Sequence, residues 1–230
     1  MLISVIIPTL NEADWLSGTL DSVVRQPGPK EIIVADGTST DHTRVIAQRR
    51  ARVVSSARGR AVQMNAAASV ASGDTLLFLH ADTRLCGGAL EAVRHALADP
   101  IAEGGIFRLR FDTSGFWPAT YTLFARIHWR HICFGDRGLF VRRSVFEKIG
   151  GYPEIPIFED LHLACMLHVR GGFRYLQTPV TTAWRRFAHV GALRQQGRNL
   201  RLWLQYMSGT PPLHLAHRYP NHNPSDELSS

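Results

Sequence analysis

The stretch Thr75-Leu-Leu-Phe-Leu-His-Ala-Asp-Thr83 decides how the rest of the sequence is interpreted. Its apolar run is too short for an ordinary helix and too continuous for a half-exposed strand, so it predicts a strand buried on both faces. Ligands of open parallel sheets bind at the carboxyl ends of the strands, which places His80 and Asp82 at an expected binding site. Each also has an ordinary structural explanation, Asp82 as a turn cap and His80 as a hydrogen-bonding residue at a strand end.

Three units before this stretch each join a short apolar run to a helical segment. The runs predict strands over residues 2–7, 31–35 and 52–55, and the segments after them predict helices over residues 12–25, 41–50 and 60–71. Asn11 is expected to cap the first helix, and Ser39, Thr40 and Asp41 supply caps for the second. Strands that alternate with helices predict an α/β protein with a mostly parallel sheet covered on both faces.

Polar residues follow each of the four predicted strands. In chain order they are Thr9, Asn11 and Glu12, then Asp36, then Ser55, Arg58 and Arg60, and finally His80 and Asp82. Because parallel strands end at the same edge of a sheet, we predict that these side chains converge on one ligand crevice. Loop polarity alone is weak evidence, since loops are polar in most proteins.

The alternation is less regular after residue 100. Strands are predicted over residues 103–111, 138–142 and 173–176, and helices over residues 118–131, 143–149, 159–170 and 192–207. In the last helix Leu193, Leu200, Leu204 and Met207 share one face, and Arg194, Arg198 and Arg201 share another. Such a helix could lie on a membrane, but we favour a terminal helix docked on the domain with its basic face in solvent. Residues 1–218 are predicted to form one domain, followed by a frayed tail over residues 219–230.

The net charge of +7 is unevenly distributed along the 230 residues. No Asp or Glu lies between Asp160 and Asp226, a segment that contains eight Arg. Such a basic segment suits phosphate groups, nucleic acid or an anionic membrane surface, although a solvated basic face explains any single Arg equally well. Of these partners we expect phosphate groups other than those of nucleic acid.

The cysteines and the N-terminal residues indicate in which cellular compartment the protein is expected. Cys86, Cys133 and Cys165 are far apart and form no C-x-x-C pair, so neither a disulfide framework nor a zinc knuckle is indicated. The first apolar run reaches Pro8 too soon for a signal peptide, and no stretch approaches the roughly 20 apolar residues of a membrane span. We therefore expect a cytoplasmic protein, whose contact with the inner face of the membrane, if any, is peripheral.

Several familiar phosphate sites are excluded by their motifs. The place after the first strand, where a dinucleotide-binding fold has G-x-G-x-x-G, holds Pro-Thr-Leu-Asn-Glu, and no P-loop is present. Aspartate-nucleophile phosphatases begin with D-x-D-x-T, but His80 stands in place of their first Asp, so that alternative is weak. The remaining set is Asp82 and His80 as candidate metal ligands, with Arg58 and Arg60 on the neighbouring loop. Carboxylate oxygens, with or without an imidazole, suit Mg²⁺ or Mn²⁺, and Arg suits the diphosphate that such a metal accompanies.

Four motifs, in this order, resemble those of the family 2 glycosyltransferases of the GT-A fold. They are Ser4-Val-Ile-Ile-Pro-Thr-Leu-Asn-Glu12, Ile32-Ile-Val-Ala-Asp-Gly-Thr-Ser-Thr-Asp-His-Thr43, Asp82 at a strand end, and Glu159-Asp160. Each motif is weak alone, but the order and spacing match over residues 1–175. The resemblance implies a three-layer α/β/α sandwich of the GT-A type, with a nucleotide half over residues 1–100 and an acceptor half over residues 101–218.

The resemblance also implies a role for each matching residue. Asn11, Glu12 and Asp36 match positions that hold the nucleoside of a nucleoside diphosphate sugar, and Thr9, Arg58, Arg60 and Ala81 are further candidate nucleotide contacts. Asp82 matches the last Asp of the D-x-D motif, which binds Mn²⁺ or Mg²⁺, and Asp160 matches the general base of inverting members. His80 replaces the first Asp of that motif, so its part in metal binding is open.

The predicted function is transfer of a sugar from a nucleoside diphosphate, with UDP preferred, to an unknown acceptor with inversion. His-Ala-Asp-Thr, Gly135-Asp-Arg-Gly138 and the Pro-Glu-Ile-Pro stretch before Glu159 also resemble a short bacterial subgroup linked to arsenosugar pathways. Two alternatives remain: a nucleotide-sugar-binding protein without catalysis, and a peripheral membrane protein whose basic C-terminal helix is the functional part.

Overall fold

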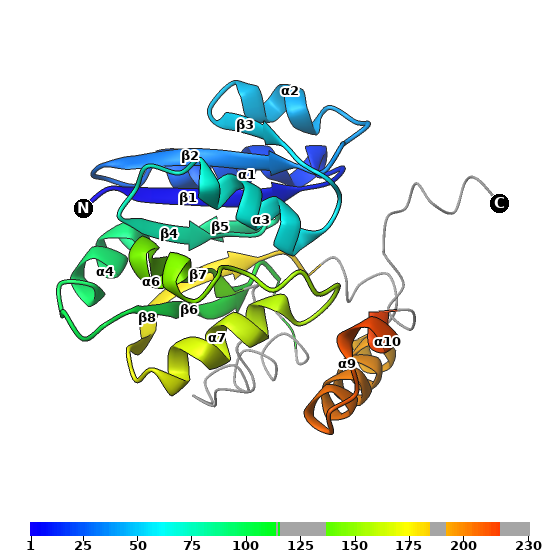
Figure 1. Ribbon diagram of the computed structural model, residues 1–230. Coiled ribbons are helices and arrows are strands. Elements are labelled where there is room, and N and C mark those ends of the chain that lie inside the picture. Colours follow the sequence, from blue (N-terminus) through cyan, green and yellow to red (C-terminus); the bar gives the residue numbers. More distant parts are fainter. Residues whose placement is uncertain (114, 116–136, 185–191, 217–230) are drawn as a thin grey trace.

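The computed structural model describes residues 1–113, 115, 137–184 and 192–216 (Figure 1). Its strands are β1 (Ile3–Thr9), β2 (Lys30–Asp36), β3 (Arg52–Ser55), β4 (Thr75–Phe78), β5 (Thr83–Leu85), β6 (Gly104–Phe111), β7 (Leu139–Arg142) and β8 (Phe173–Thr182). Its helices are α1 (Ala13–Val24), α2 (Thr43–Gln48), α3 (Arg60–Ser69), α4 (Ala89–Ala96), α6 (Arg143–Lys148), α7 (Glu159–Val169), α9 (Ala192–Met207) and α10 (Pro212–Ala216). The helix predicted over residues 118–131 and the tail predicted over residues 219–230 lie outside the described residues.

The described strands form one sheet in the order β3-β2-β1-β4-β7-β6-β8-β5. The pairs β1–β2, β1–β4, β2–β3 and β6–β8 are parallel, whereas β4–β7, β6–β7 and β5–β8 are antiparallel. The mostly parallel sheet predicted from the sequence is thus confirmed. Because β7 runs against both β4 and β6, the carboxyl ends of β1, β2, β4, β6 and β8 and the start of β7 all lie at the same edge.

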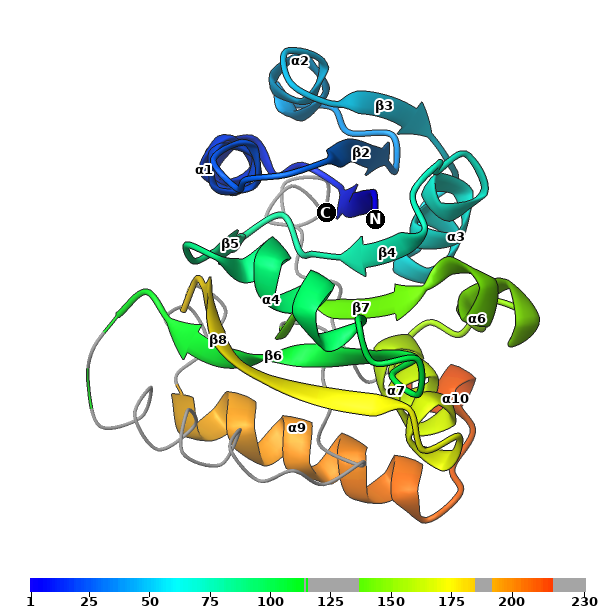
Figure 2. The ribbon, with the colours of Figure 1, turned by 90° about the vertical axis from the view of Figure 1, so that its left-hand side faces the viewer.

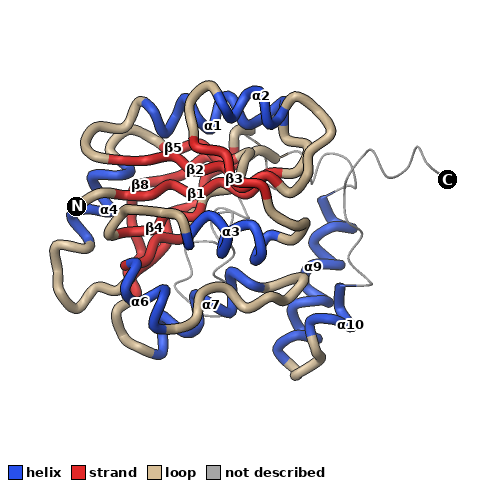
Figure 3. The backbone as a smooth tube through the Cα atoms, turned by 45° about the horizontal axis from the view of Figure 1, so that its top comes forward, coloured by secondary structure: helices blue, strands red, loops and turns tan. Residues whose placement is uncertain are grey.

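Helices cover both faces of the sheet, which explains why its central strands carry continuous apolar runs. Helices α1, α2 and α4 pack on one face against residues that include Val5, Val34 and Leu77. Helices α3, α6 and α7 pack on the other face against residues that include Ile6, Ile33 and Phe78. Figures 2 and 3 show these three layers, with α1 and α2 on one side of the sheet and α3 and α7 on the other.

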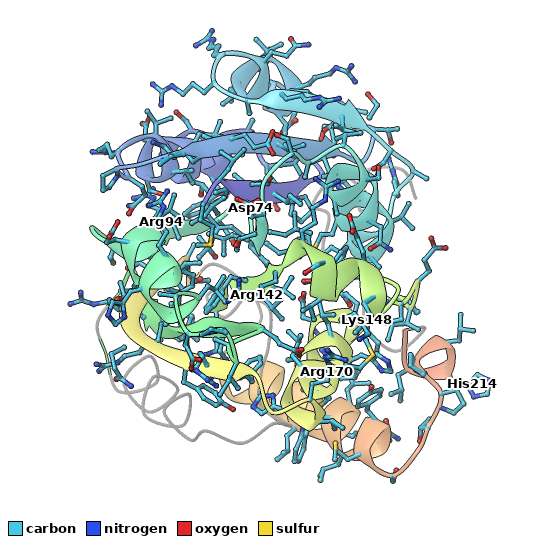
Figure 4. The ribbon with its side chains drawn as sticks, turned by 60° about the vertical axis from the view of Figure 1, so that its left-hand side comes forward. Asp74, Arg94, Arg142, Lys148, Arg170 and His214 are labelled. Carbon is cyan, nitrogen blue, oxygen red and sulfur yellow. The ribbon has the colours of Figure 1, made fainter. Side chains whose placement is uncertain are left out.

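Three elements that follow β4 differ from the prediction. Helix α4 and the short edge strand β5 were not predicted, and β8 has ten residues where four were expected. The sequence after Leu176 contains Pro179, which disfavours a strand, but β8 gains ladder partners from both β6 and β5. Arg142, at the end of β7, fastens the α4–β6 connection by donating hydrogen bonds to the carbonyls of Leu97, Asp99 and Ala102 (Figure 4).

The prediction that Asn11 caps the first helix is wrong. Asn11 has a left-handed backbone with φ +53°, and its side-chain oxygen accepts the backbone N–H of Thr40 at 2.8 Å. The carboxylate of Asp41 instead accepts the N–H groups of Ala13 at 3.2 Å and Thr43 at 2.9 Å. One side chain therefore satisfies donors at the starts of both α1 and α2, which a local reading of caps cannot foresee.

Candidate active site

Four predicted site residues stand at the carboxyl edge of the parallel strands. Thr9 ends β1 and Asp36 ends β2, and the two are partners in the register of the sheet. His80 and Asp82 follow β4, whose residue Phe78 pairs with Ile6 of β1. All four site side chains are buried. The edge predicted from the sequence is therefore real, and the structure brings these residues to one side of the sheet.

The ends of β1 and β2 are held by a residue that the sequence analysis missed. Gln63, buried on α3, donates its side-chain amide to the backbone carbonyls of Thr9 and Ala35, both at 2.8 Å. Asp36 accepts the backbone N–H of Ser39 at 3.2 Å. An amide side chain within the otherwise Ala-rich α3 was the available signal, because such a group needs partners when buried.

The loops after β1 and β2 interlock at this edge. The hydroxyl of Ser39 accepts the N–H of Asn11 at 3.0 Å, and the hydroxyl of Thr43 accepts the N–H of Glu12 at 2.7 Å. Thr38 is left-handed with φ +70°, and its hydroxyl accepts a hydrogen bond from Arg58 at 3.4 Å. Non-glycine residues held in this conformation cost about 1–3 kcal/mol each and concentrate at functional sites. The predicted contacts Asn11, Glu12 and Arg58 thus form one loop cluster with Asp36.

Hydrogen bonds to the backbone carbonyls of residues 80–82, which carry the predicted metal ligands, fix the turn between β4 and β5. The carbonyl of Ala81 accepts the hydroxyl of Thr19 at 2.7 Å, and the carbonyl of His80 accepts the N–H of Thr83 at 3.1 Å. The carbonyl of Asp82 accepts the N–H of Ala183, just beyond β8, at 3.1 Å. Two segments distant in sequence, α1 and the end of β8, therefore help to hold this turn in place.

Two carboxylates from the second half of the chain meet residues of the first half. Glu159 and Asp160 are buried at the start of α7, where Phe158 before them is left-handed with φ +65°. Arg60 of α3 places its Nε 3.0 Å from Oε1 of Glu159. His80 places its Nε2 3.8 Å from Oδ2 of Asp160, a distance for ion pairing rather than hydrogen bonding. Arg60, predicted as a nucleotide contact, and His80, predicted as a metal ligand, thus lie beside the predicted base.

The two neighbouring carboxyl groups have opposite pKa shifts. Burial raises the pKa of Asp160, but His80 first, and then Arg60 and Tyr152, outweigh burial and lower it below its usual value of 3.8. Burial and the neighbouring charge of Asp160 together outweigh Arg60 and raise the pKa of Glu159 above 4.5. Burial, followed by the charge of Asp160, raises the pKa of Tyr152 as well. Of the two neighbouring carboxyl groups, Asp160 therefore loses its proton at the lower pH.

The raised pKa of Glu159 predicts a pH dependence of stability. A carboxyl group that binds its proton more tightly in the folded than in the unfolded protein favours folding at low pH, and this contribution is lost as the pH rises from 4.5 through the folded pKa. Glu159→Gln removes that titration. We expect the melting temperature of the natural protein to rise relative to that of the variant as the pH is lowered from neutrality towards 4.5.

Thermal unfolding of both proteins over this range is the measurement. Asp160→Asn is the comparison variant. The pKa of Asp160 itself is lowered below 3.8, outside this range, and its charge is one of several causes of the raised pKa of Glu159, so we expect a smaller pH dependence for Asp160→Asn than for Glu159→Gln. A melting-temperature difference that changes with pH for Asp160→Asn but stays constant for Glu159→Gln would show that the two shifts are assigned to the wrong residues.

The predicted metal ligands form no cage of their own. Among the described residues, no group of three or more His, Cys, Asp or Glu side chains could hold an ion. Mg²⁺ and Mn²⁺ beside a diphosphate need only one or two protein carboxylates, because phosphate oxygens and water complete the shell. Asp82, buried at the end of β4, fits such a shared site, whereas the imidazole of His80 faces Asp160. Metal binding by either residue stays a prediction.

Sequence comparison identifies relatives of this chain. Residues 4–152 match the family model described as Glycosyl transferase family 2. The relatives include the PGL/p-HBAD biosynthesis glycosyltransferases of Mycobacterium bovis and Mycobacterium tuberculosis, which are 34% identical over 166 residues. The aligned part covers 66% of this chain and 63% of each relative, so the chain spans less than two thirds of their length.

Structure comparison identifies the same kind of fold. S. aureus TarS 1-349 in complex with UDP has a TM-score of 0.67 and 18% identity, over 80% of this chain and 60% of that chain. Mannosyltransferase PcManGT from Pyrobaculum calidifontis, in complex with GDP-Man and Mn²⁺, has a TM-score of 0.59 and 25% identity, over 79% and 56%. These neighbours are GT-A-type glycosyltransferases, which confirms the predicted fold. The family model covers more than half of the sequence, and the chain therefore belongs to glycosyl transferase family 2.

Proposed function

We propose that this protein transfers a sugar from a nucleoside diphosphate sugar to an acceptor with inversion, and that Asp160 is the general base. The observation that carries the proposal is the pair of buried carboxyl groups with opposite pKa shifts, placed beside the strand-end residue His80. A base must be unprotonated before reaction, and the lowered pKa of Asp160 meets that need at neutral pH. The family and the fold support this class of reaction.

In the proposed reaction the acceptor group gives its proton to Asp160 as its oxygen bonds to the anomeric carbon. The bond from that carbon to the diphosphate breaks through an oxocarbenium-like state, and the electron pair leaves with the diphosphate. The side chain of Arg60 is 37% exposed at the start of α3, so its guanidinium can approach the leaving group while Nε stays near Glu159. A divalent metal at Asp82 would supply further positive charge to the diphosphate.

His80 has a proposed part in this scheme that differs from metal ligation. Its imidazole lies beside the carboxylate of Asp160 and helps to hold the pKa of that group down. The base therefore stays charged inside a buried site, at the expense of some basicity. The substitution of His for the first Asp of the motif also avoids a like charge near Asp160.

The loop cluster of Asn11, Glu12, Asp36 and Arg58 is the proposed nucleoside site. The interlocking hydrogen bonds of this cluster support a preformed site, because they fix the loops without a ligand. We propose UDP as the nucleotide, with GDP as the rival, since TarS is solved with UDP and PcManGT with GDP-Man and Mn²⁺.

A thermal-shift panel of UDP, GDP, CDP and TDP, each with and without Mn²⁺, tests the donor class. A ligand present at 100 times its dissociation constant adds about 2.7 kcal/mol to the free energy of unfolding. We expect UDP with Mn²⁺ to raise the melting temperature most. A larger shift with GDP would transfer the proposal to GDP sugars, and no shift with any of the four would contradict a nucleotide-sugar donor.

A further inference from the structure

Helices α9 and α10 lie together at one margin of the domain, beyond α7 (Figure 1). Helix α9 is attached by Leu202, which is buried in a small cluster with Ile157 and with Leu215 of α10. The ring of Tyr206 adds a contact with Phe158, at 4.8 Å between centroids. This docking face of α9 is not the face on which the sequence concentrates leucines.

The leucine-rich face of α9 points away from the domain. Leu200 is 56% exposed, Leu204 53% and Met207 39%, and Leu213 of α10 is 67% exposed. Residues 200, 204 and 207 share one side of a helix because they are four and three positions apart. Nine large apolar side chains are exposed in the part of the chain that the structure describes. These four belong to the neighbouring helices α9 and α10, whereas Met1, Val24, Val45, Ile101 and Val169 are scattered over other elements. We call the four residues the apolar strip.

The surroundings of the apolar strip are basic. The stretch from α7 to the end of α10 contains no Asp or Glu after Asp160. Arg194, Arg198 and Arg201 belong to α9, and the side chain of Arg201 is exposed. His214, next to Leu213, points outward from α10 (Figure 4). An apolar strip beside the exposed Arg201, in a stretch of sequence without acidic residues, is complementary to the surface of an anionic bilayer.

We propose that the apolar strip docks on the surface of an anionic lipid bilayer. An amphipathic helix of this kind lies in the plane of the interface, with its apolar side chains among the acyl chains and its Arg side chains at the headgroups. Within the described residues no helix is long and apolar enough to cross a bilayer.

Docking by this face would orient the rest of the molecule. The strip is carried by helices that pack on Ile157 and Phe158, and these residues directly precede Glu159 and Asp160. The residues on which α9 and α10 pack are therefore the immediate sequence neighbours of the buried carboxyl groups. The inference does not rest on the proposed function, since lipid binding can be measured without any sugar donor.

Vesicle flotation of the full chain tests the proposal at low salt. Vesicles of phosphatidylcholine alone are compared with vesicles in which about a third of the lipid is phosphatidylglycerol. We expect the protein to float with the anionic vesicles, to be released as salt screens the Arg side chains, and to remain unbound with phosphatidylcholine. A protein that stays unbound from anionic vesicles would overturn the proposal.

The double variant Leu200→Gln with Leu204→Gln removes the centre of the strip and keeps good helix formers. We expect its partition onto anionic vesicles to fall by about tenfold or more. The matched control is Ile101→Gln with Val169→Gln, which removes two exposed apolar residues elsewhere and should bind like the natural protein. Melting temperatures verify that both variants are folded.

Equal binding by the natural protein and the Leu200/Leu204 variant would overturn the assignment of the strip. Dimerisation in the absence of lipid, lost in the same variant, would also overturn it, since a second copy of the chain would then be the occupant of this face. Sedimentation velocity of both proteins distinguishes these outcomes.

Discussion

Replacing Asp160 by Asn is expected to lower the rate of sugar transfer by about 100-fold to 10,000-fold, the usual contribution of general base catalysis. The Asn side chain keeps the size of the carboxylate and can still serve a helix start, but it cannot accept the proton of the acceptor. Donor affinity should change little, because the predicted nucleoside contacts belong to the loops after β1 and β2. Initial rates of transfer and calorimetric titration with the donor are the two measurements.

Glu159→Gln is the matched control for this prediction. Glu159 adjoins Asp160 and is also buried, but its raised pKa makes it the poorer candidate for a charged base. We expect a smaller loss of rate from Glu159→Gln than from Asp160→Asn. If Glu159→Gln proves the more damaging change, the base has been assigned to the wrong residue. If Asp160→Asn leaves both transfer and donor binding unaltered, Asp160 is a structural residue.

Replacing Asp82 by Ala is expected to abolish the strengthening of nucleotide binding by Mn²⁺ or Mg²⁺. The motivation is a single buried carboxylate at the end of β4, in a region where the described residues offer no three-ligand site. The variant should bind the nucleotide with the same dissociation constant in the presence and in the absence of metal. The reason is that the other metal ligands are expected to come from the diphosphate and water. Calorimetry of the natural protein and the variant, in metal and in chelator, measures that ratio.

His80→Asn separates the two roles considered for the imidazole. Because Nε2 of His80 lies 3.8 Å from the carboxylate of Asp160, we expect this variant to keep the metal effect on nucleotide binding while its transfer rate falls. A metal effect that persists in Asp82→Ala but vanishes in His80→Asn would reverse the assignment and make His80 the ligand.

The parallel half of the fold could be predicted from the sequence because its signals are local. Each strand of that half is a short apolar run, and each is followed by polar residues before a helix begins. Since parallel strands share an edge, the convergence of Thr9, Asp36, His80 and Asp82 followed from strand direction alone. The resemblance to the family motifs then predicted the chemical roles of the residues at that edge.

The remaining features depend on contacts between residues distant in sequence. Nothing near Arg60 in the sequence indicates Glu159 as its partner, and nothing near Asn11 indicates that Asp41 supplies the cap of α1. The length of β8 is likewise set by two neighbouring strands rather than by its own residues. The pattern of α9 predicted an amphipathic helix correctly, but amphipathicity alone does not say which face meets the domain.

The position of β4 between β1 and β7 has a consequence for biosynthesis. Phe78, the last residue of β4, pairs with Leu139 of β7. At a synthesis rate of about 5–20 residues per second, Leu139 leaves the ribosome roughly 3 to 12 seconds after Phe78. During that interval an apolar strand end, Leu76-Leu-Phe78, presents an unpaired edge of N–H and C=O groups, which invites aggregation. The half that carries the predicted donor residues is therefore translated first but cannot complete its sheet until the second half has emerged.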